Sequence, residues 1–174
     1  MIVKFISKLL KIFPNRSMDD AIEVSQRLFD KAQSTIRIVG GNLNHNFYDA
    51  PSIVEALKKA IERGVSIEII TGPVWDEETV QLLNLAQSNG IKLYRLDHRP
   101  PVHFTVVDGT HTRLEEYHTS VQKDRRAYAM FDTIILGKKL DVEFLMMKDK
   151  AKVWDGARYL VEVSQYRTMF EKMR

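Results

Sequence analysis

The sequence predicts an α/β fold, with a mixed sheet that begins with parallel strands and is flanked by helices. Three short β-type runs, STIRIVGGN, VSIEIITGP and IKLYRLD, alternate with two stretches of helical periodicity, as in βαβ units. Farther along, VHFTVVDGTHTRLEE contains two alternating runs around Asp-Gly, a strong short-range signal for a β-hairpin. With 174 residues, 44% of them hydrophobic, the chain is long enough for one domain with a real core.

An amphipathic N-terminal segment, 1–16, precedes a domain predicted to span 17–174. Apolar residues of this segment follow helical spacing and lysines gather on another side: Ile2, Ile6, Leu9 and Phe13 against Lys4, Lys8 and Lys11. The lysines interrupt the apolar centre that a signal peptide needs, and no apolar run reaches the roughly 18 residues of a membrane span. Residues 2–13 are expected to pack as a first helix on the domain or its dimer mate, or else to anchor the protein peripherally to a membrane.

Capping residues define two helices in the first half. Ser17 and Asp20 form a capping-box pattern, which opens the first helix of the domain. Ser52 is expected to cap the helix IVEALKKAIERG, which ends at Gly64.

The second half gives weaker signals for its elements. AYAMFDTIIL is predicted to be a further strand, because it is rich in β-branched and aromatic residues. KKLDVEFLMMKDKAKVW reads equally as helix or strand. The end, DGARYLVEVSQYRTMFEKMR, has an apolar stripe at helical spacing and is predicted to be a closing helix.

Charge and cysteine content limit the function only loosely. The chain has 26 Lys+Arg, 23 Asp+Glu and no cysteine. The absence of cysteine excludes disulfides, a thiolate nucleophile and Cys-ligated zinc, and it fits a cytoplasmic location. The small basic excess permits an anionic partner, but the basic clusters are short and do not require nucleic acid.

The motifs of the first half give the chain a resemblance to the phospholipase D superfamily. SIVEALKKAIERGVSIEIITGP contains AL-x-x-A-x-x-RGV leading into an apolar strand, a frequent pattern in that family. The likeness continues through NGIKLYRL, the VVDG turn and the final FEKM, so it covers about 17–174. The resemblance implies phosphodiester chemistry through a phospho-histidine, without metal or other cofactor, in a site that two copies of one motif build together. A chain with one motif is then expected to be a homodimer.

The family's catalytic strand carries His-x-Lys, four residues and Asp-Gly, and this chain departs from it. Anchoring the motif on Asp108 puts Pro101 in the nucleophile position and His103 in the lysine position. Proline has no nucleophilic group. The resemblance therefore implies a degenerate, non-catalytic domain that acts as a ligand-binding or assembly module.

The family's Gly-Ser-x-Asn motif falls on 115–118, which puts His118 in the asparagine position. If the family geometry holds, Glu116, His118 and His103 face one pocket, with Asp108 completing the candidate catalytic set. Two imidazoles and a carboxylate are able to bind a metal or move protons, but solvated hairpin side chains explain the pattern more simply. No helical His spacing indicates a metal site.

An active enzyme is the alternative. If the strand is two residues shorter than in the family, His103 becomes the nucleophile and Thr105 takes the lysine position. Strand alternation does not choose between the registers, because both spacings to Asp108 are odd. The chain would then be a phosphodiesterase or nuclease with a rearranged site in a homodimer.

Two polar loops supply candidate contacts for a phosphate-containing ligand. Asn42, Asn44 and His45 follow the first strand, at the sheet edge where α/β proteins place ligands. Arg125 and Arg126 lie in QKDRRAY, where Tyr128 would stack on a nucleic-acid base. An ordinary turn and a solvated connection are the simpler interpretations of these two loops.

Overall fold

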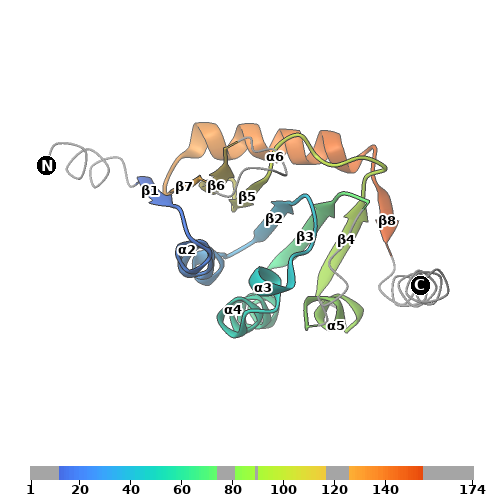
Figure 1. The fold of residues 1–174 in the computed structure, drawn as a ribbon, viewed down its shortest axis with the longest axis horizontal. Coiled ribbons are helices and arrows are strands. Elements are labelled where there is room, and N and C mark those ends of the chain that lie inside the picture. Colours follow the sequence, from blue (N-terminus) through green and yellow to red (C-terminus); the bar gives the residue numbers. More distant parts are fainter. Residues whose placement is uncertain (1–11, 74–80, 89, 117–125, 155–174) are drawn as a thin grey trace, which may run out of the picture.

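A mixed eight-stranded sheet forms the centre of the protein (Figure 1). The computed structural model describes residues 12–73, 81–88, 90–116 and 126–154. The strand order is β1-β7-β6-β5-β2-β3-β4-β8. The strands are β1 (Ile12–Asn15), β2 (Thr35–Val39), β3 (Ser66–Thr71), β4 (Ile91–Arg95), β5 (Phe104–Val107), β6 (His111–Glu115), β7 (Ala127–Met130) and β8 (Lys152–Trp154).

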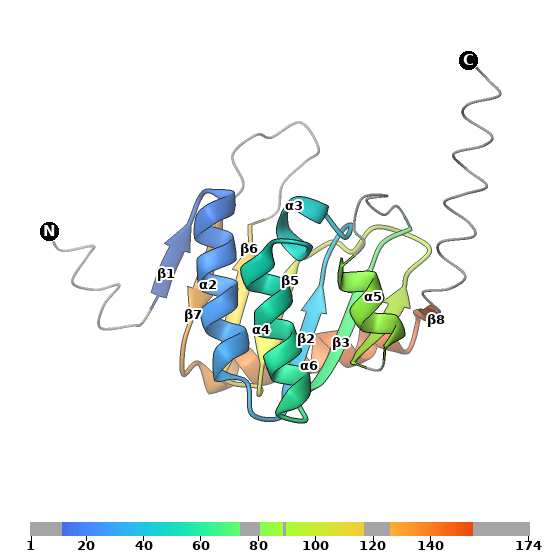
Figure 2. The same cartoon turned by 90° about the horizontal axis from the view of Figure 1, so that it is seen from below.

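Helices cover both faces of this sheet (Figures 1 and 2). One face carries α2 (Met18–Lys31), α3 (His45–Tyr48), α4 (Pro51–Glu62) and α5 (Gln81–Gln87), and the other carries α6 (Ile134–Lys148). Each face has its own apolar cluster. Leu28, Ile36 and Leu57 belong to the larger cluster, under α2 and α4, and Phe104 and Phe144 belong to the smaller one, under α6.

The predicted parallel start of the sheet is confirmed. β2 pairs with β3 and β3 with β4 in parallel, whereas β5 joins β2 in the antiparallel sense. The predicted hairpin is β5 and β6, joined at Asp108 and Gly109, whose φ angles of 52° and 63° suit an Asp-Gly turn.

The capping predictions are right for α2 and wrong for α4. Ser17 Oγ accepts a hydrogen bond from the backbone N–H of Asp20 at 3.0 Å, and Asp20 completes the capping box. In α4 the N-cap is Ala50, so Ser52 already lies inside the helix. The helix starts earlier because Pro51 has a preset φ and lacks only an N–H that the first turn leaves unpaired.

The N-terminal segment is not helical where the structure describes it. Ile12 and Phe13 belong to β1, which pairs antiparallel with β7, so the helix predicted over 2–13 is wrong for these two residues. Residues 2–11 lie outside the described ranges. Phe13 packs edge-on against Phe131 at 5.5 Å, and an edge strand tolerates Pro14 because one side of its backbone needs no partner.

The stretch AYAMFDTIIL, predicted to be a strand, is a strand only over β7, and its last three residues begin helix α6. The ambiguous stretch that follows continues α6 and ends in β8. Tertiary packing overrides the β-branched start of the helix, because Leu140 and Phe144 are buried on the sheet. The closing helix predicted for 155–174 lies outside the described residues.

Candidate functional site

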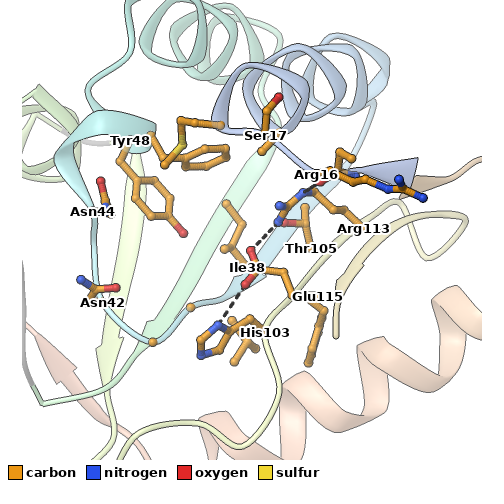
Figure 3. A pocket seen from close by; sticks show the side chains of 18 residues that line it. Arg16, Ser17, Ile38, Asn42, Asn44, Tyr48, His103, Thr105, Arg113 and Glu115 are labelled. Atoms are coloured by element: carbon orange, nitrogen blue, oxygen red, sulfur yellow. Dashed lines mark hydrogen bonds and ion pairs between the residues drawn. The ribbon is translucent and has the colours of Figure 1, made fainter. Parts of the chain in front are cut away.

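A pocket of about 390 Å³ opens between α2, α3 and the β5–β6 hairpin (Figure 3). It lies at the carboxyl end of β2, the sheet edge at which the sequence predicted a ligand. Its polar and glycine lining comes from four stretches of chain: Asn15, Arg16 and Ser17; Gly40, Gly41, Asn42, Asn44 and Tyr48; His103 and Thr105; Arg113 and Glu115.

A chain of polar side chains crosses this pocket (Figure 3). His103 Nδ1 lies 3.1 Å from Glu115 Oε2, and Arg113 donates to the other carboxylate oxygen at 2.7 Å. Arg113 Nε also donates to Asn15 Oδ1 at 3.2 Å. Glu115 therefore links the imidazole and the guanidinium.

The hairpin register sets this arrangement. Phe104 pairs with Leu114, and Glu115 donates its backbone N–H to the His103 carbonyl at 3.0 Å, so His103 and Glu115 lie directly across from each other. The expectation that Glu116 shares a pocket with His103 is wrong. Its side chain instead accepts a hydrogen bond from the Tyr128 hydroxyl at 2.9 Å.

The carboxylate of Glu115 is held in its charged form. Burial raises the pKa of Glu115, but the hydrogen bond from His103 and the charge of Arg113 outweigh burial and bring the pKa to about 2. Among the described residues, the lining has two arginines, Arg16 and Arg113, and this one carboxylate. The described lining thus has a positive excess even when the His103 imidazole is neutral.

Tyr48 and Asn15 add hydrogen-bonding groups at the wall. The Tyr48 hydroxyl points into the pocket, and burial raises its pKa, so it is a neutral donor (Figure 3). Asn15 is 3% exposed, and its Nδ2 has no hydrogen-bond partner among the described residues. A buried donor left unsatisfied is costly.

Sequence reasoning missed five contributors to this site: Asn15, Arg16, Tyr48, Arg113 and Glu115. Arg113 and Glu115 had a usable signal, because they are two residues apart and so share one face of the strand. The other three reach the pocket only through tertiary packing.

Only some of the candidate ligand contacts meet in the pocket. Asn42 and Asn44 line it, although the Asn44 side chain is used in part to cap α3 through the Asn46 N–H at 2.9 Å. His45 is the first residue of α3 and is not part of the lining. Arg126 is exposed and also outside the lining. Arg125 lies outside the described residues.

The candidate catalytic set is not assembled. Asp108 lies at the hairpin turn, where its carboxylate accepts hydrogen bonds from backbone N–H groups and is absent from the pocket lining. Pro101 is exposed and also outside the lining. His118 falls outside the described residues. His103 alone of these residues lines the pocket.

The loop after β2 packs closely on His103. A methyl group on Gly41 would lie 2.7 Å from His103 Nε2, so only glycine allows this approach of backbone and ring. The imidazole is therefore held by Glu115 at Nδ1 and flanked by backbone at Nε2.

Among the described residues, no three His, Asp and Glu side chains gather closely enough to bind a metal ion. None of the helices in those ranges has the length and apolar content to traverse a bilayer.

Solved structures resemble this chain in fold. No family model and no curated protein matches the sequence. Nuc from Salmonella typhimurium, a phospholipase D family member, matches with a TM-score of 0.64 and 18% identity, over 82% of this chain and 97% of Nuc. NucT from Helicobacter pylori matches with a TM-score of 0.60 and 12% identity, over 82% and 99% of the two chains.

An archaeal chromatin protein that binds DNA, TrmBL2, matches with a TM-score of 0.62 and 12% identity, over 87% of this chain and 60% of TrmBL2. These likenesses confirm the predicted phospholipase D-like fold, with its mixed sheet and flanking helices. At such low identities they establish the fold alone.

Proposed function

We propose that this chain, a phospholipase D-like domain, binds a small phosphate-containing anion in the pocket around His103 and Arg113 and does not cleave it. The positive excess of the pocket supports this proposal most directly. Arg113 is 11% exposed and fixed by Glu115 and Asn15, so one edge of its guanidinium is held at a defined place. Planar guanidinium groups bind phosphate oxygens in pairs.

Size and backbone also suit such a ligand. About 390 Å³ is at the small end of the volumes that hold small molecules. Gly40 and Gly41 let backbone approach the ligand closely, and the Tyr48 hydroxyl adds a neutral donor. TrmBL2 shows that a protein of this fold class binds a phosphate-bearing polymer as a chromatin protein.

The absence of cleavage rests on the nucleophile position. Pro101 occupies it in the register anchored on Asp108, and Pro101 lies outside the pocket. Proline offers no group that attacks phosphorus. His103, in the lysine position, already contacts Glu115 through Nδ1, and its ring lies against Gly41.

Calorimetric titration with inorganic phosphate tests the binding proposal. Arg113→Lys is expected to weaken phosphate binding about tenfold, because a lysine does not reproduce the paired hydrogen bonds of a guanidinium. The matched control is Arg27→Lys, since Arg27 is an exposed residue of α2 outside the pocket and should leave affinity unchanged. Equal affinity of wild type and Arg113→Lys, or no binding to wild type, would contradict the proposal.

One observation favours a second function, that of a phosphodiesterase. Glu115 fixes His103 Nδ1 at 3.1 Å, which is how a carboxylate orients an imidazole for attack through Nε2. In that reaction Nε2 bonds to phosphorus, the bond to the leaving oxygen breaks, and water later hydrolyses the phospho-histidine.

Hydrolysis of bis(p-nitrophenyl) phosphate separates the two functions. The binding module is expected to give no turnover above buffer in either wild type or His103→Asn. Turnover in wild type that His103→Asn abolishes, together with a trapped phosphorylated histidine, would establish the enzyme instead.

A further inference from the structure

The pocket around His103 and Arg113 also has an apolar side, which a phosphate group does not use. Met18 at the start of α2 and Phe47 in α3 both line the pocket. Met18 is 40% exposed, and among the large hydrophobic side chains that stay exposed in the described ranges it alone lines this pocket. An apolar surface is therefore open to a ligand at Met18.

Helix capping does not account for a methionine at this position. Ser17 is the N-cap of α2, so Met18 is the first helical residue. The apolar contact that often accompanies a capping box joins the residue before the N-cap to the fourth helical residue, and these are Arg16 and Ala21 here. Met18 takes no part in such a contact. Its flexible thioether side chain is suited to contact ligands of irregular shape.

Phe47 is held in place by its own packing. It contacts the larger apolar cluster of the core, and its ring meets the Tyr48 ring edge-on, with the two centroids 4.9 Å apart. Tyr48 is itself buried. A wall that is already ordered loses little conformational entropy when a ligand binds to it.

The apolar and the charged groups lie on different sides of the pocket. Figure 3 shows Arg113 and Tyr48 on opposite sides, with the Ile38 side chain between them. Phe47 belongs to the Tyr48 side, because the two rings are in contact. Met18 comes from α2, the helix that contacts α3. A ligand that crosses the pocket thus meets a guanidinium at one end and apolar side chains at the other.

Acidic residues next to Met18 limit the ligand further. Asp19 and Asp20 follow it in the first turn of α2, and both are exposed. Their carboxylates are charged at neutral pH and would repel a second phosphate group near Met18. The pocket therefore suits one phosphate attached to an uncharged group.

We propose that the ligand of this pocket is a phosphate monoester whose organic group is apolar and packs against Met18 and Phe47. This inference rests on the proposed function and deepens it by naming the class of ligand. A volume of about 390 Å³ leaves room for such a group beside the phosphate. The apolar group is expected to add about tenfold in affinity, because its surface leaves water on binding.

Calorimetric titration with phenyl phosphate and with glycerol phosphate tests the proposal. Both probes carry one phosphate, and only the first has an apolar organic group. Wild type is expected to bind phenyl phosphate about tenfold more tightly than glycerol phosphate. Met18→Gln, which keeps the length of the side chain, is expected to reduce this ratio to about twofold or less. Arg113→Lys is expected to weaken the binding of both probes and to preserve the ratio.

Met146→Gln is the matched control, because Met146 is an exposed methionine of α6 outside the pocket and the change should leave the ratio as it is in wild type. Circular dichroism shows that each variant is folded. Equal affinity of wild type for the two probes, with both dependent on Arg113, would overturn this inference and leave phosphate binding intact. An unchanged ratio in Met18→Gln would overturn it as well. Failure of wild type to bind either probe would contradict the proposed function and this inference together.

Discussion

Replacing Asp108 with alanine is expected to lower the free energy of unfolding by about 3 kcal/mol or more. The carboxylate accepts hydrogen bonds from three consecutive backbone N–H groups, each at 2.8 Å, and so ties the hairpin turn to the chain entering β2: Gln33, Ser34 and Thr35. A hydrogen bond to a charged group contributes about 1.5–3 kcal/mol, and alanine removes the acceptor of all three. Urea denaturation monitored by circular dichroism measures the loss.

Two further variants separate the hydrogen bonds from backbone strain. Asp108 has a φ of 52°, where alanine is strained by about 1–2 kcal/mol, whereas Asp108→Gly removes the carboxylate without that strain. Asp132 also has a positive φ, 61°, and its carboxylate lies 3.7 Å from His111 Nδ1, so Asp132→Ala reports the strain together with the loss of that contact. An Asp108→Gly variant as stable as wild type would show that the three hydrogen bonds contribute nothing to stability.

The structural role of Asp108 shows what a motif on its own does not reveal. The Asp-Gly pair predicted the turn correctly, because few residues adopt positive φ. The same pair also marked the family motif, and this suggested a catalytic part for the aspartate. Its partners lie more than 70 residues earlier in the chain, and no local pattern indicates that contact.

The central strands were predictable because their burial is visible in the sequence. β2, β3 and β4 are short runs rich in apolar residues with a glycine close to one end or both, and most of their residues are buried, as expected for strands covered on both faces. Helix α6 was not predictable in the same way. Its exposed side also carries apolar residues, such as Ile135 and Val142, so the uniformly polar face that normally reveals a surface helix is missing.

The prediction of which β6 residues face His103 was wrong by one position in the pairing of β5 with β6. The alternation along β6 was correct, with Arg113 and Glu115 on one face and Glu116 on the other. Which of these faces His103 joins depends on the pairing of β5 with β6, and a shift of one residue exchanges the two faces. The spacing within each strand does not contain that information.

Glu115→Gln is expected to lower the free energy of unfolding by about 3 kcal/mol at neutral pH. The contacts with His103 and Arg113 bring the pKa of Glu115 from 4.5 to about 2 in the folded protein. A carboxylate with a lowered pKa stabilises the fold above its unfolded pKa, and this contribution is lost as the pH falls through 2. The gap between wild type and Glu115→Gln should therefore be widest above about pH 5 and close toward pH 2, in urea titrations at successive pH values.

The pH dependence of this gap distinguishes charge from shape. Other carboxylates with lowered pKa values, such as Glu68, lose their contribution in both proteins, so they cancel in the difference. Glu116→Gln is the matched control. Glu116 is exposed, lies outside the pocket and accepts a hydrogen bond from the Tyr128 hydroxyl, so the change should cost less than about 1 kcal/mol. If the Glu115→Gln gap stayed constant from neutral pH to about pH 2, the packing of the side chain rather than its charge would hold the pocket together. Arg113 and His103 would then be positioned by the strands themselves, and Glu115 would be dispensable to the anion site.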